Sequence, residues 1–373
     1  MPHDFDTVAT THAIIDAARA NLADDVWDYI TGAAESETTA RRNRLGIDSL
    51  VLRPRVGRDV SVVDPSTALL GHRLRIPVVL APIGALEAIT PDGGIATARA
   101  AERFGTLAAI SSVTKPSLEE VAASTTAPLI SQLYIRGDAE WSEQLIGRVA
   151  SSGYAAIALT VDSAHYGRRE RQLRSGWRPP THRDGRPEPG IVWQARLTWD
   201  RLEAMREQSG LAAMVKGVQS GRDAEIAVDR GFEVVWVSNH GGRDLDHADA
   251  TIESLREVVD AVGGRAEIVV DGGFLRGTDV LKAVALGATA VAVGRLEALA
   301  LAAGGEAALV RVLEILEEEI SVAMALLGVT KLSELDENYV RRAQALPAAS
   351  PLLAAFPERA VDWPRDGPRD GAG

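Results

Sequence analysis

The feature that most constrains the fold of this chain is an eightfold alternation of short apolar runs with helical patterns. Runs such as VVLAP and EIVVDGG are rich in β-branched residues and have no polar face. Continuous apolar runs are typical of strands buried on both faces of a parallel sheet. The predicted strands cover residues 77–81, 107–111, 129–134, 155–161, 213–216, 234–238, 267–271 and 290–294.

A helical pattern follows each predicted strand. Eight strand–helix units over roughly 250 residues fit a (β/α)8 TIM barrel, an α/β fold, better than an open doubly wound sheet. An open sheet more often carries a glycine-rich dinucleotide loop, and the chain contains no G-x-G-x-x-G motif. The predicted helices cover residues 94–104, 118–123, 139–151, 199–208, 222–230, 251–262, 278–286 and 306–326.

Three segments fall outside this alternation. Residues 1–75 predict a short helical region that Gly32 ends, followed by a mostly irregular connector to the barrel at 76–335. Residues 163–198 form a long connection rich in Arg, Pro and Gly, which indicates a functional or a disordered loop. Residues 346–373 have the composition of a disordered tail.

Charge and composition exclude several classes of function. The chain has 40 Lys and Arg against 52 Asp and Glu, and this net charge of −12 argues against nucleic acid as a partner. The absence of Cys excludes disulfides, thiolate metal sites and a Cys nucleophile. The most apolar stretch, 288–303, contains Gly294, Arg295 and Glu297, so no membrane span is expected. The first residues do not resemble a leader, and we expect a cytoplasmic protein.

Polar residues gather where the predicted strands end, which is where a (β/α)8 barrel places its active site. His240 follows an apolar strand within Asn, Gly, Gly and Arg neighbours, a setting that suits a general base. Asp162 ends another strand and could pair with His240, or it could only anchor a loop. Several Arg residues meet few carboxylates there, which favours an anionic ligand. No H-E-x-x-H or similar spacing occurs, so no metal is expected.

Two glycine turns indicate a phosphate site. Gly272-Gly273 and Gly294-Arg295 follow the seventh and eighth predicted strands, where this barrel commonly binds phosphate through backbone N–H groups. The alternative is that these glycines only make tight turns.

At the level of motifs the chain resembles the FMN-dependent α-hydroxy-acid oxidases and dehydrogenases over about residues 15–335. The resemblance lies in LTVDSAHYGRRE, VKGV, SNHGGRDLD, VDGGFLRGTDVLKAVALGA and VAVGR. It implies the same barrel, a bound FMN, and oxidation of an (S)-2-hydroxy acid to the 2-oxo acid. It also implies a homo-oligomer, either a tetramer or an octamer.

The resemblance gives roles to the residues at the strand ends. His240 corresponds to the active-site base and Asp162 to the carboxylate that pairs with it. Arg169 and Arg243 correspond to the clamp on the substrate carboxylate, for which a guanidinium offers bidentate geometry. Tyr134 and Tyr29 correspond to phenols that bind the substrate carboxylate or hydroxyl.

The resemblance likewise implies which residues bind the cofactor. Lys216 corresponds to a cation that stabilises negative charge on the reduced flavin. Asp271 corresponds to the partner of the ribityl chain. The remaining cofactor-binding positions are Pro82, Ile83, Gly84, Ser111, Gln132, Thr160 and Ser238 around the flavin ring, and Gly273, Gly294 and Arg295 around the phosphate.

The chain departs from the family pattern at several positions. Leu275 stands where many members have an Arg that binds the FMN phosphate. Either Arg276 takes over this contact, or Arg295 is the only arginine that binds the phosphate. Asp244 replaces the usual Gln after SNHGGR, and it either perturbs the site or faces solvent. Gly84 favours a dehydrogenase or monooxygenase over a simple oxidase, and the short loop 163–198 favours an open pocket.

Two other functions remain compatible with the sequence. The same barrel could act as a flavin-dependent isomerase or lyase, although such an enzyme has no use for paired carboxylate-binding arginines. A catalytically altered flavin-binding scaffold is the other alternative, and Leu275 is its main support.

Overall fold

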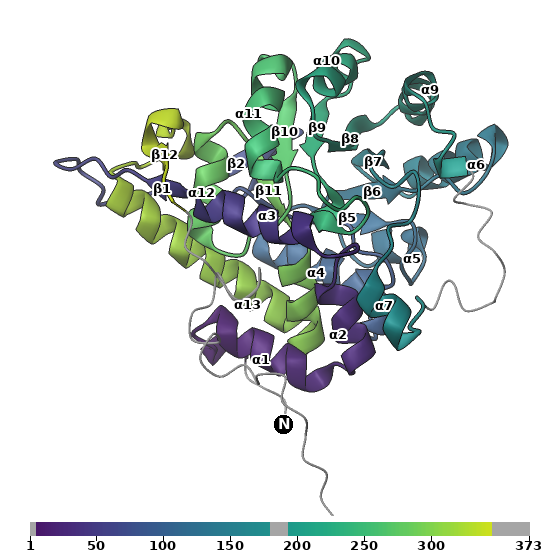
Figure 1. Cartoon of the computed structure of the whole chain (residues 1–373), viewed down its shortest axis with the longest axis horizontal. Coiled ribbons are helices and arrows are strands. Elements are labelled where there is room, and N and C mark those ends of the chain that lie inside the picture. Colours follow the sequence, from purple (N-terminus) through teal and green to yellow (C-terminus); the bar gives the residue numbers. More distant parts are fainter. Residues whose placement is uncertain (1–4, 180–192, 345–373) are drawn as a thin grey trace, which may run out of the picture.

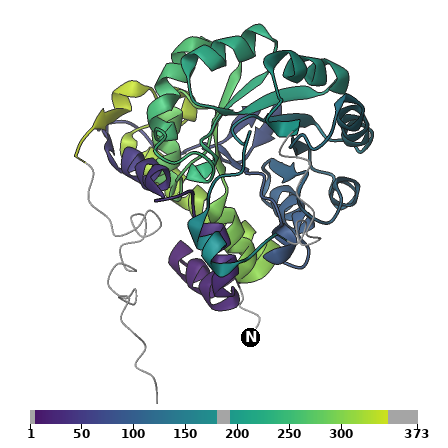
Figure 2. The same cartoon turned by 45° about the vertical axis from the view of Figure 1, so that its right-hand side comes forward.

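Eight parallel strands form a closed barrel, as the sequence predicts. The computed structural model describes residues 5–179 and 193–344. Neighbouring strands follow chain order, and the last pairs with the first through Val291 and Val78. The ring of strands lies inside the helices in Figure 2. The barrel strands are β4 (Val78–Leu80), β5 (Ala108–Ser111), β6 (Leu129–Leu133), β7 (Ala156–Thr160), β8 (Ala212–Val218), β9 (Val234–Val237), β10 (Glu267–Val270) and β11 (Ala290–Val293).

Helices connect these strands on the outside of the barrel. Several begin with the side-chain caps expected from their sequence, such as Asp138, which accepts a hydrogen bond from Trp141 N. Ser117 and Glu120 form a reciprocal capping box. The helices after the barrel strands are α4 (Gly94–Phe104), α5 (Leu118–Ala122), α6 (Ala139–Ser151), α7 (Glu170–Ser175), α9 (Trp199–Ser209), α10 (Gly221–Asp229), α11 (Thr251–Val262), α12 (Gly277–Ala285) and α13 (Arg295–Leu327).

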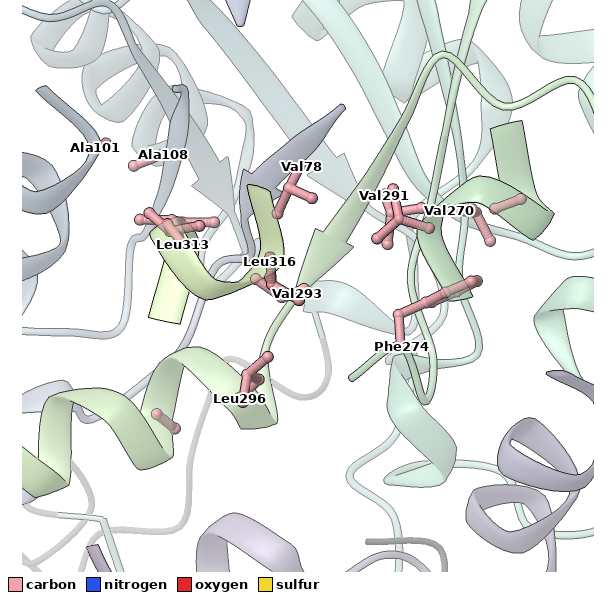
Figure 3. Close-up of a cluster of buried hydrophobic side chains, with 14 of the residues drawn as sticks. Val78, Ala101, Ala108, Val270, Phe274, Val291, Val293, Leu296, Leu313 and Leu316 are labelled. Atoms are coloured by element: carbon pink, nitrogen blue, oxygen red, sulfur yellow. The ribbon is translucent and has the colours of Figure 1, made fainter. Parts of the chain in front are cut away.

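The barrel divides the apolar core into two layers, because successive side chains of a strand point to opposite faces. One buried set, which includes Val79, Met214 and Trp236, fills the barrel interior. The other set, which includes Val78 and Val293, packs against the surrounding helices. In Figure 3, Leu316 of α13 lies beside these two valines. Burial on both faces therefore explains the continuous apolar runs.

The connector before the barrel contains regular elements that the sequence pattern does not predict. The first part is helical as predicted, with α1 (Thr11–Asn21) and α2 (Asp24–Thr31), and α1 packs along α13 (Figure 1). A further helix, α3 (Thr38–Asp48), lies in the connector. The connector also contains β1 (Leu50–Leu52), which pairs with β12 (Val340–Arg342), and the hairpin of β2 (Thr67–Leu69) and β3 (His72–Leu74). Short 3-10 turns are η1 (Phe5–Thr7), η2 (Leu86–Ala88), η5 (Leu332–Glu334) and η6 (Glu337–Tyr339).

Helix α13 starts earlier than predicted, directly after β11. It is interrupted at Gly304 and Gly305, where the backbone leaves helical geometry and Gly305 adopts a φ of +62°. A Cβ on Gly304 would lie 2.0 Å from the Phe5 ring, so the close approach of the N-terminal turn requires a glycine there. The two glycines hid residues 295–305, the first third of the helix, from the sequence pattern.

The remaining predictions concern the C-terminal tail, the long connection and membrane spans. The tail at 346–373 lies outside the described residues, as does 180–192 of the long connection. Across residues 5–179 and 193–344, no helix combines the length and apolar character needed to cross a membrane.

Candidate active site

His240 stands at the carboxyl end of β9 on an unusual turn. The turn η4 (His240–Gly242) has positive φ at all three residues, +56° at His240, +64° at Gly241 and +76° at Gly242. A Cβ on Gly242 would lie 2.7 Å from Ala40 N, so the turn packs tightly on α3. Positive φ is strained for a non-glycine residue and persists only where the surroundings hold it. The turn directs the imidazole to the mouth of the barrel.

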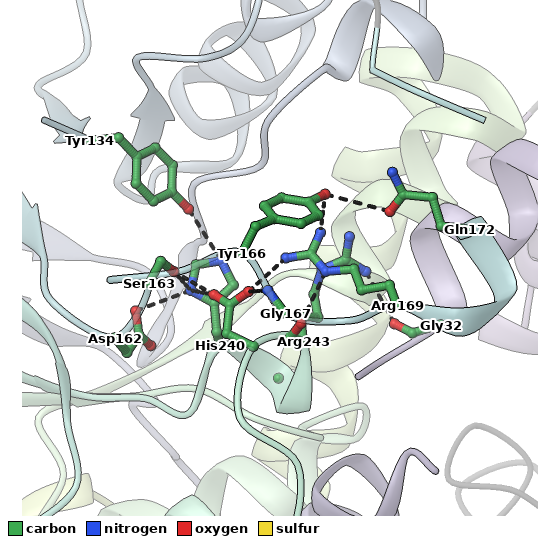
Figure 4. Close-up of polar contacts among 12 residues, drawn as sticks. Gly32, Tyr134, Asp162, Ser163, Tyr166, Gly167, Arg169, Gln172, His240 and Arg243 are labelled. Atoms are coloured by element: carbon green, nitrogen blue, oxygen red, sulfur yellow. Dashed lines mark hydrogen bonds and ion pairs between the residues drawn. The ribbon is translucent and has the colours of Figure 1, made fainter. Parts of the chain in front are cut away.

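The His240 ring lies between a carboxylate and a phenol. Its Nδ1 is 3.1 Å from Asp162 Oδ1 and 3.1 Å from Ser163 Oγ, while its Nε2 is 3.2 Å from the Tyr134 hydroxyl (Figure 4). Because an ionised carboxylate only accepts hydrogen bonds, we assign the proton to Nδ1, which leaves Nε2 as the acceptor. Burial raises the pKa of Asp162, but the nearby Lys216 and His240 outweigh this effect and hold the pKa below its usual value.

The structure settles where Asp244 lies: it faces the site and not solvent. Its side chain is 5% exposed, and its Oδ1 accepts hydrogen bonds from Arg169 Nη2 at 3.1 Å and Gly167 N at 3.0 Å. Its Oδ2 accepts a hydrogen bond from the Ser163 hydroxyl and lies 3.6 Å from His240 Nδ1. Burial opposes ionisation, but His240 and Arg169 hold the pKa of Asp244 well below its usual value.

Arg169 and Arg243 lie next to each other beyond His240 (Figure 4). Arg169 donates from Nε to the Arg243 carbonyl at 3.0 Å and from Nη1 to the Tyr166 hydroxyl at 2.6 Å. Arg243 donates from Nη1 to the carbonyls of Tyr29 at 2.7 Å and Gly32 at 3.1 Å. Burial, together with the positive charge of Arg169, lowers the pKa of Arg243. Two adjacent guanidiniums at a buried position favour an anionic ligand.

Tyr29 closes this end of the site from the N-terminal helix α2. Its hydroxyl donates to the Gly84 carbonyl at 3.0 Å, and its ring packs on Trp177 with 4.2 Å between ring centroids. The Arg243 guanidinium lies 4.9 Å from the centre of the Tyr29 ring, within cation–π range. Burial raises the pKa of Tyr29, so the phenol stays neutral.

Lys216 on β8 forms a buried network with Ser238 and Asp271, which directly follow β9 and β10. Its Nζ donates to Ser238 Oγ at 3.0 Å and lies 3.4 Å from Asp271 Oδ2. Ser238 in turn donates to Asp271 Oδ1 at 2.8 Å, and Trp236 Nε1 donates to Oδ2 at 2.9 Å. Burial favours the neutral amine, but Asp271 and Asp162 outweigh it and raise the pKa of Lys216, which therefore remains a cation.

A second buried chain of hydrogen bonds crosses three strand ends. Ser111 donates to Gln132 Oε1 at 2.7 Å, and Gln132 Nε2 donates to Thr160 Oγ1 at 2.7 Å. Ser111 and Thr160 are the last residues of β5 and β7, and Gln132 is the last but one of β6. Pro82, Ile83 and Gly84 follow β4 at the adjacent part of the mouth.

The predicted phosphate turns lie at the ends of β10 and β11. Gly273 has a φ of +90°, a conformation that suits glycine, and Gly294 precedes α13. Arg276 forms an ion pair with Glu319 at 2.6 Å, so Arg276 does not replace the arginine missing at Leu275. Arg295 is the remaining arginine of the two candidates.

The surroundings of Arg295 suit an anionic group. Its Nη2 donates only to carbonyl oxygens, those of Gly32 at 3.2 Å and Gly241 at 2.9 Å, and its buried Nε has no hydrogen-bond partner among residues 5–179 and 193–344. Burial, together with the charge of Arg243, lowers the pKa of Arg295 to about 9. A phosphate would give the Nε of Arg295 a partner and would favour the charged form of its guanidinium. The space beside Gly294 is open, because an ideal Cβ there would meet only Ala81 within 4 Å. The residues present therefore fit FMN.

Comparison with known proteins identifies the family. The model for FMN-dependent dehydrogenases matches residues 18–342. The chain belongs to this family. It is 37% identical to glycolate oxidase 1 of Zea mays, over 92% of this chain and 96% of that protein. It is 38% identical to an L-lactate oxidase of a Nostoc species, over 87% and 95%. A crystal structure of mandelate oxidase with (S)-4-hydroxymandelic acid superposes with a TM-score of 0.85 at 34% identity, over 91% of this chain and 100% of that one.

Membership of the FMN-dependent α-hydroxy-acid oxidase family makes the chain an oxidoreductase that uses FMN and oxidises 2-hydroxy acids. It therefore favours the redox reaction over the isomerase and scaffold alternatives. The predicted site residues converge on one mouth of the barrel. Ser163, Tyr166 and Asp244 join them there without having been predicted as site residues, although all three stand within the motifs LTVDSAHYGRRE and SNHGGRDLD.

Proposed function

We propose that this enzyme oxidises an (S)-2-hydroxy acid to the 2-oxo acid, with His240 as the base and with Arg169 and Arg243 as the carboxylate clamp. The observation that carries the proposal is the position of the His240 ring. Its Nδ1 is 3.1 Å from Asp162 Oδ1, and its Nε2 is 3.2 Å from the Tyr134 hydroxyl.

Different residues would bind the substrate and transfer the proton. Arg243 and Arg169 would bind the substrate carboxylate and so orient the carbinol carbon towards His240. Oxidation removes two electrons and two protons from the carbinol, and FMN, when bound, would supply the acceptor for both electrons and for one of the two protons. His240 Nε2 accepts a substrate proton, and Asp162 stabilises the imidazolium that results. Tyr134, a neutral phenol, donates a hydrogen bond to the substrate oxygen or to Nε2.

The Lys216 network supports this reaction electrostatically. A cation held by Ser238 and Asp271 in a buried position stabilises negative charge that develops nearby. The chain from Ser111 through Gln132 to Thr160 would offer polar groups to the flavin ring. Arg295 would hold the phosphate.

Anaerobic mixing of the FMN-loaded protein with both enantiomers of several 2-hydroxy acids tests the proposal. We expect (S)-acids to bleach the flavin absorbance and to yield the 2-oxo acid, while (R)-acids do not. Admission of oxygen, with assays for peroxide and for a decarboxylated acid, then distinguishes oxidase, dehydrogenase and monooxygenase. If no acid bleaches the flavin although FMN is bound, the proposal fails.

A further inference from the structure

Asp244 connects the predicted base with the predicted carboxylate clamp. Its two oxygens have separate partners: Oδ1 accepts from Arg169 Nη2 and Gly167 N, and Oδ2 accepts from Ser163 beside His240 Nδ1. Both oxygens already have donors, and the side chain is 5% exposed. Asp244 therefore acts on a ligand through Arg169 and through its own charge.

The partners of the other cations in the site show how Asp244 changes the net charge of the clamp. Lys216 lies beside Asp271, and His240 lies beside Asp162. Arg295 lies at the predicted phosphate end and has carbonyl partners only. At the clamp, Asp244 neutralises Arg169, whereas Arg243 donates only to carbonyl oxygens in the described hydrogen bonds.

The clamp thus carries one net positive charge, although it contains two arginines. One substrate carboxylate balances that charge. A second carboxylate on the substrate would find no free cation at the clamp and would be repelled by the buried Asp244. Discrimination by an unfavourable charge contact is effective in a site of low dielectric constant.

We propose that Asp244 is a positioning residue that sets the charge of the clamp and so selects 2-hydroxy acids with one carboxylate over those with two. The proposal rests on the proposed function, since it assumes that Arg169 and Arg243 bind the substrate carboxylate. It also assigns a role to the Asp that replaces the usual Gln of the family pattern.

Equilibrium binding to the FMN-loaded protein tests this selectivity without requiring turnover. Propionate and malonate form a non-reacting pair in which a methyl group is replaced by a carboxylate, and lactate and tartronate form the corresponding reactive pair. Dissociation constants come from the change in flavin absorbance on titration, at a pH where malonate and tartronate are dianions. The proteins compared are the wild type, Asp244→Asn and, as a matched control, Asp249→Asn, which changes an exposed carboxylate on the same loop.

We expect the wild type to bind propionate at least about tenfold more tightly than malonate. In Asp244→Asn this ratio should fall at least about tenfold, and in Asp249→Asn it should not change. A purely structural role for Asp244 would weaken both ligands alike and would leave the ratio unchanged.

Two results would overturn the inference: a wild type that binds malonate as tightly as propionate, or a folded, FMN-loaded Asp244→Asn with the wild-type ratio. If Asp244→Asn does not hold FMN, the wild-type ratio decides alone. Failure of the proposed function is a different result, because the flavin would then be reduced by neither lactate nor any other acid, whatever the binding ratio.

Discussion

Asp162 Oδ1 lies 3.1 Å from His240 Nδ1, although the two residues end strands that are separated by β8. The contact depends on Gly217 of β8, which has a φ of +118° and whose Cβ would lie 2.6 Å from Asp162 Cβ. A residue without a side chain at that point leaves room for the carboxylate to approach the imidazole. The pair therefore arises from three strand ends of the closed barrel.

Tyr134→Phe should reduce the rate of flavin reduction without changing FMN affinity. The substitution keeps the ring but removes the hydroxyl that lies 3.2 Å from His240 Nε2. Loss of one hydrogen bond of ordinary strength lowers the rate by about tenfold. Rapid mixing under anaerobic conditions measures the rate, and fluorescence titration measures FMN binding. An unchanged reduction rate would exclude the Tyr134 hydroxyl from the reaction.

Lys216→Met should slow flavin reduction by about a hundredfold or more, because it removes a buried cation from the flavin-binding end of the mouth. It should also make the midpoint potential of the bound flavin more negative, since the reduced flavin loses a positive neighbour. Spectroelectrochemical titration measures this potential. A wild-type potential in the variant would contradict the placement of Lys216 beside the flavin.

Arg295→Gln should weaken FMN at least about tenfold, because a charge-assisted hydrogen bond contributes about 1.5–3 kcal/mol. Binding of riboflavin, which lacks the phosphate, should change little. Arg276→Gln is the matched control: its guanidinium pairs with Glu319, so FMN affinity should remain at the wild-type value. Fluorescence titration of the apoprotein with both flavins checks these outcomes. If Arg276→Gln weakens FMN and Arg295→Gln does not, the phosphate assignment is wrong.

Glu297→Gln should make stability less dependent on pH. Glu297 is fully buried and accepts a hydrogen bond from the Thr97 hydroxyl at 3.0 Å, and burial raises the pKa of Glu297 well above its usual value. The folded state thus holds a proton that the unfolded state releases above about pH 4.3. The stability linked to this proton is complete below that pH and is lost as pH rises towards the folded-state pKa.

Urea unfolding of the FMN-loaded proteins at several pH values between about 6 and 9 measures the effect. The wild type should lose up to about 1.4 kcal/mol per pH unit relative to Glu297→Gln. Glu225→Gln, at an exposed position of α10, is the control and should follow the wild type. Parallel pH profiles for the wild type and Glu297→Gln would show that Glu297 is ionised in the folded protein.

The barrel was predictable from sequence because its strands are buried on both faces and therefore consist of unbroken apolar runs. Helix α3 was not predictable in this way, since its sequence, TTARRNRLGID, has no apolar stripe. Much of its buried face is polar: Asn43 donates to Asn239 at 3.0 Å, and Arg44 pairs with Asp279 at 2.7 Å. Such a helix is stabilised by partners distant in sequence, which periodicity does not detect.

The candidate site, like the fold, was only partly predictable from the sequence. Motifs in the sequence predicted His240, Asp162 and the arginines, because each stands directly after a strand end or within its loop. The sequence left Asp244 open between the site and solvent, since its position depends on how the loop after β7 brings Arg169 over it. Whether Arg276 is available for the phosphate likewise depends on its ion pair with Glu319 of α13, a contact between segments distant in sequence.

The measurement that tests the central claim most directly is single-turnover flavin reduction in His240→Gln, with FMN loading matched to the wild type. The account predicts that an (S)-2-hydroxy acid bleaches the wild-type flavin and that the variant is slower by about a thousandfold. His247→Gln, an exposed histidine with a side chain 65% exposed, should react at the wild-type rate. Reduction of His240→Gln at the wild-type rate would contradict the assignment of His240 as the base.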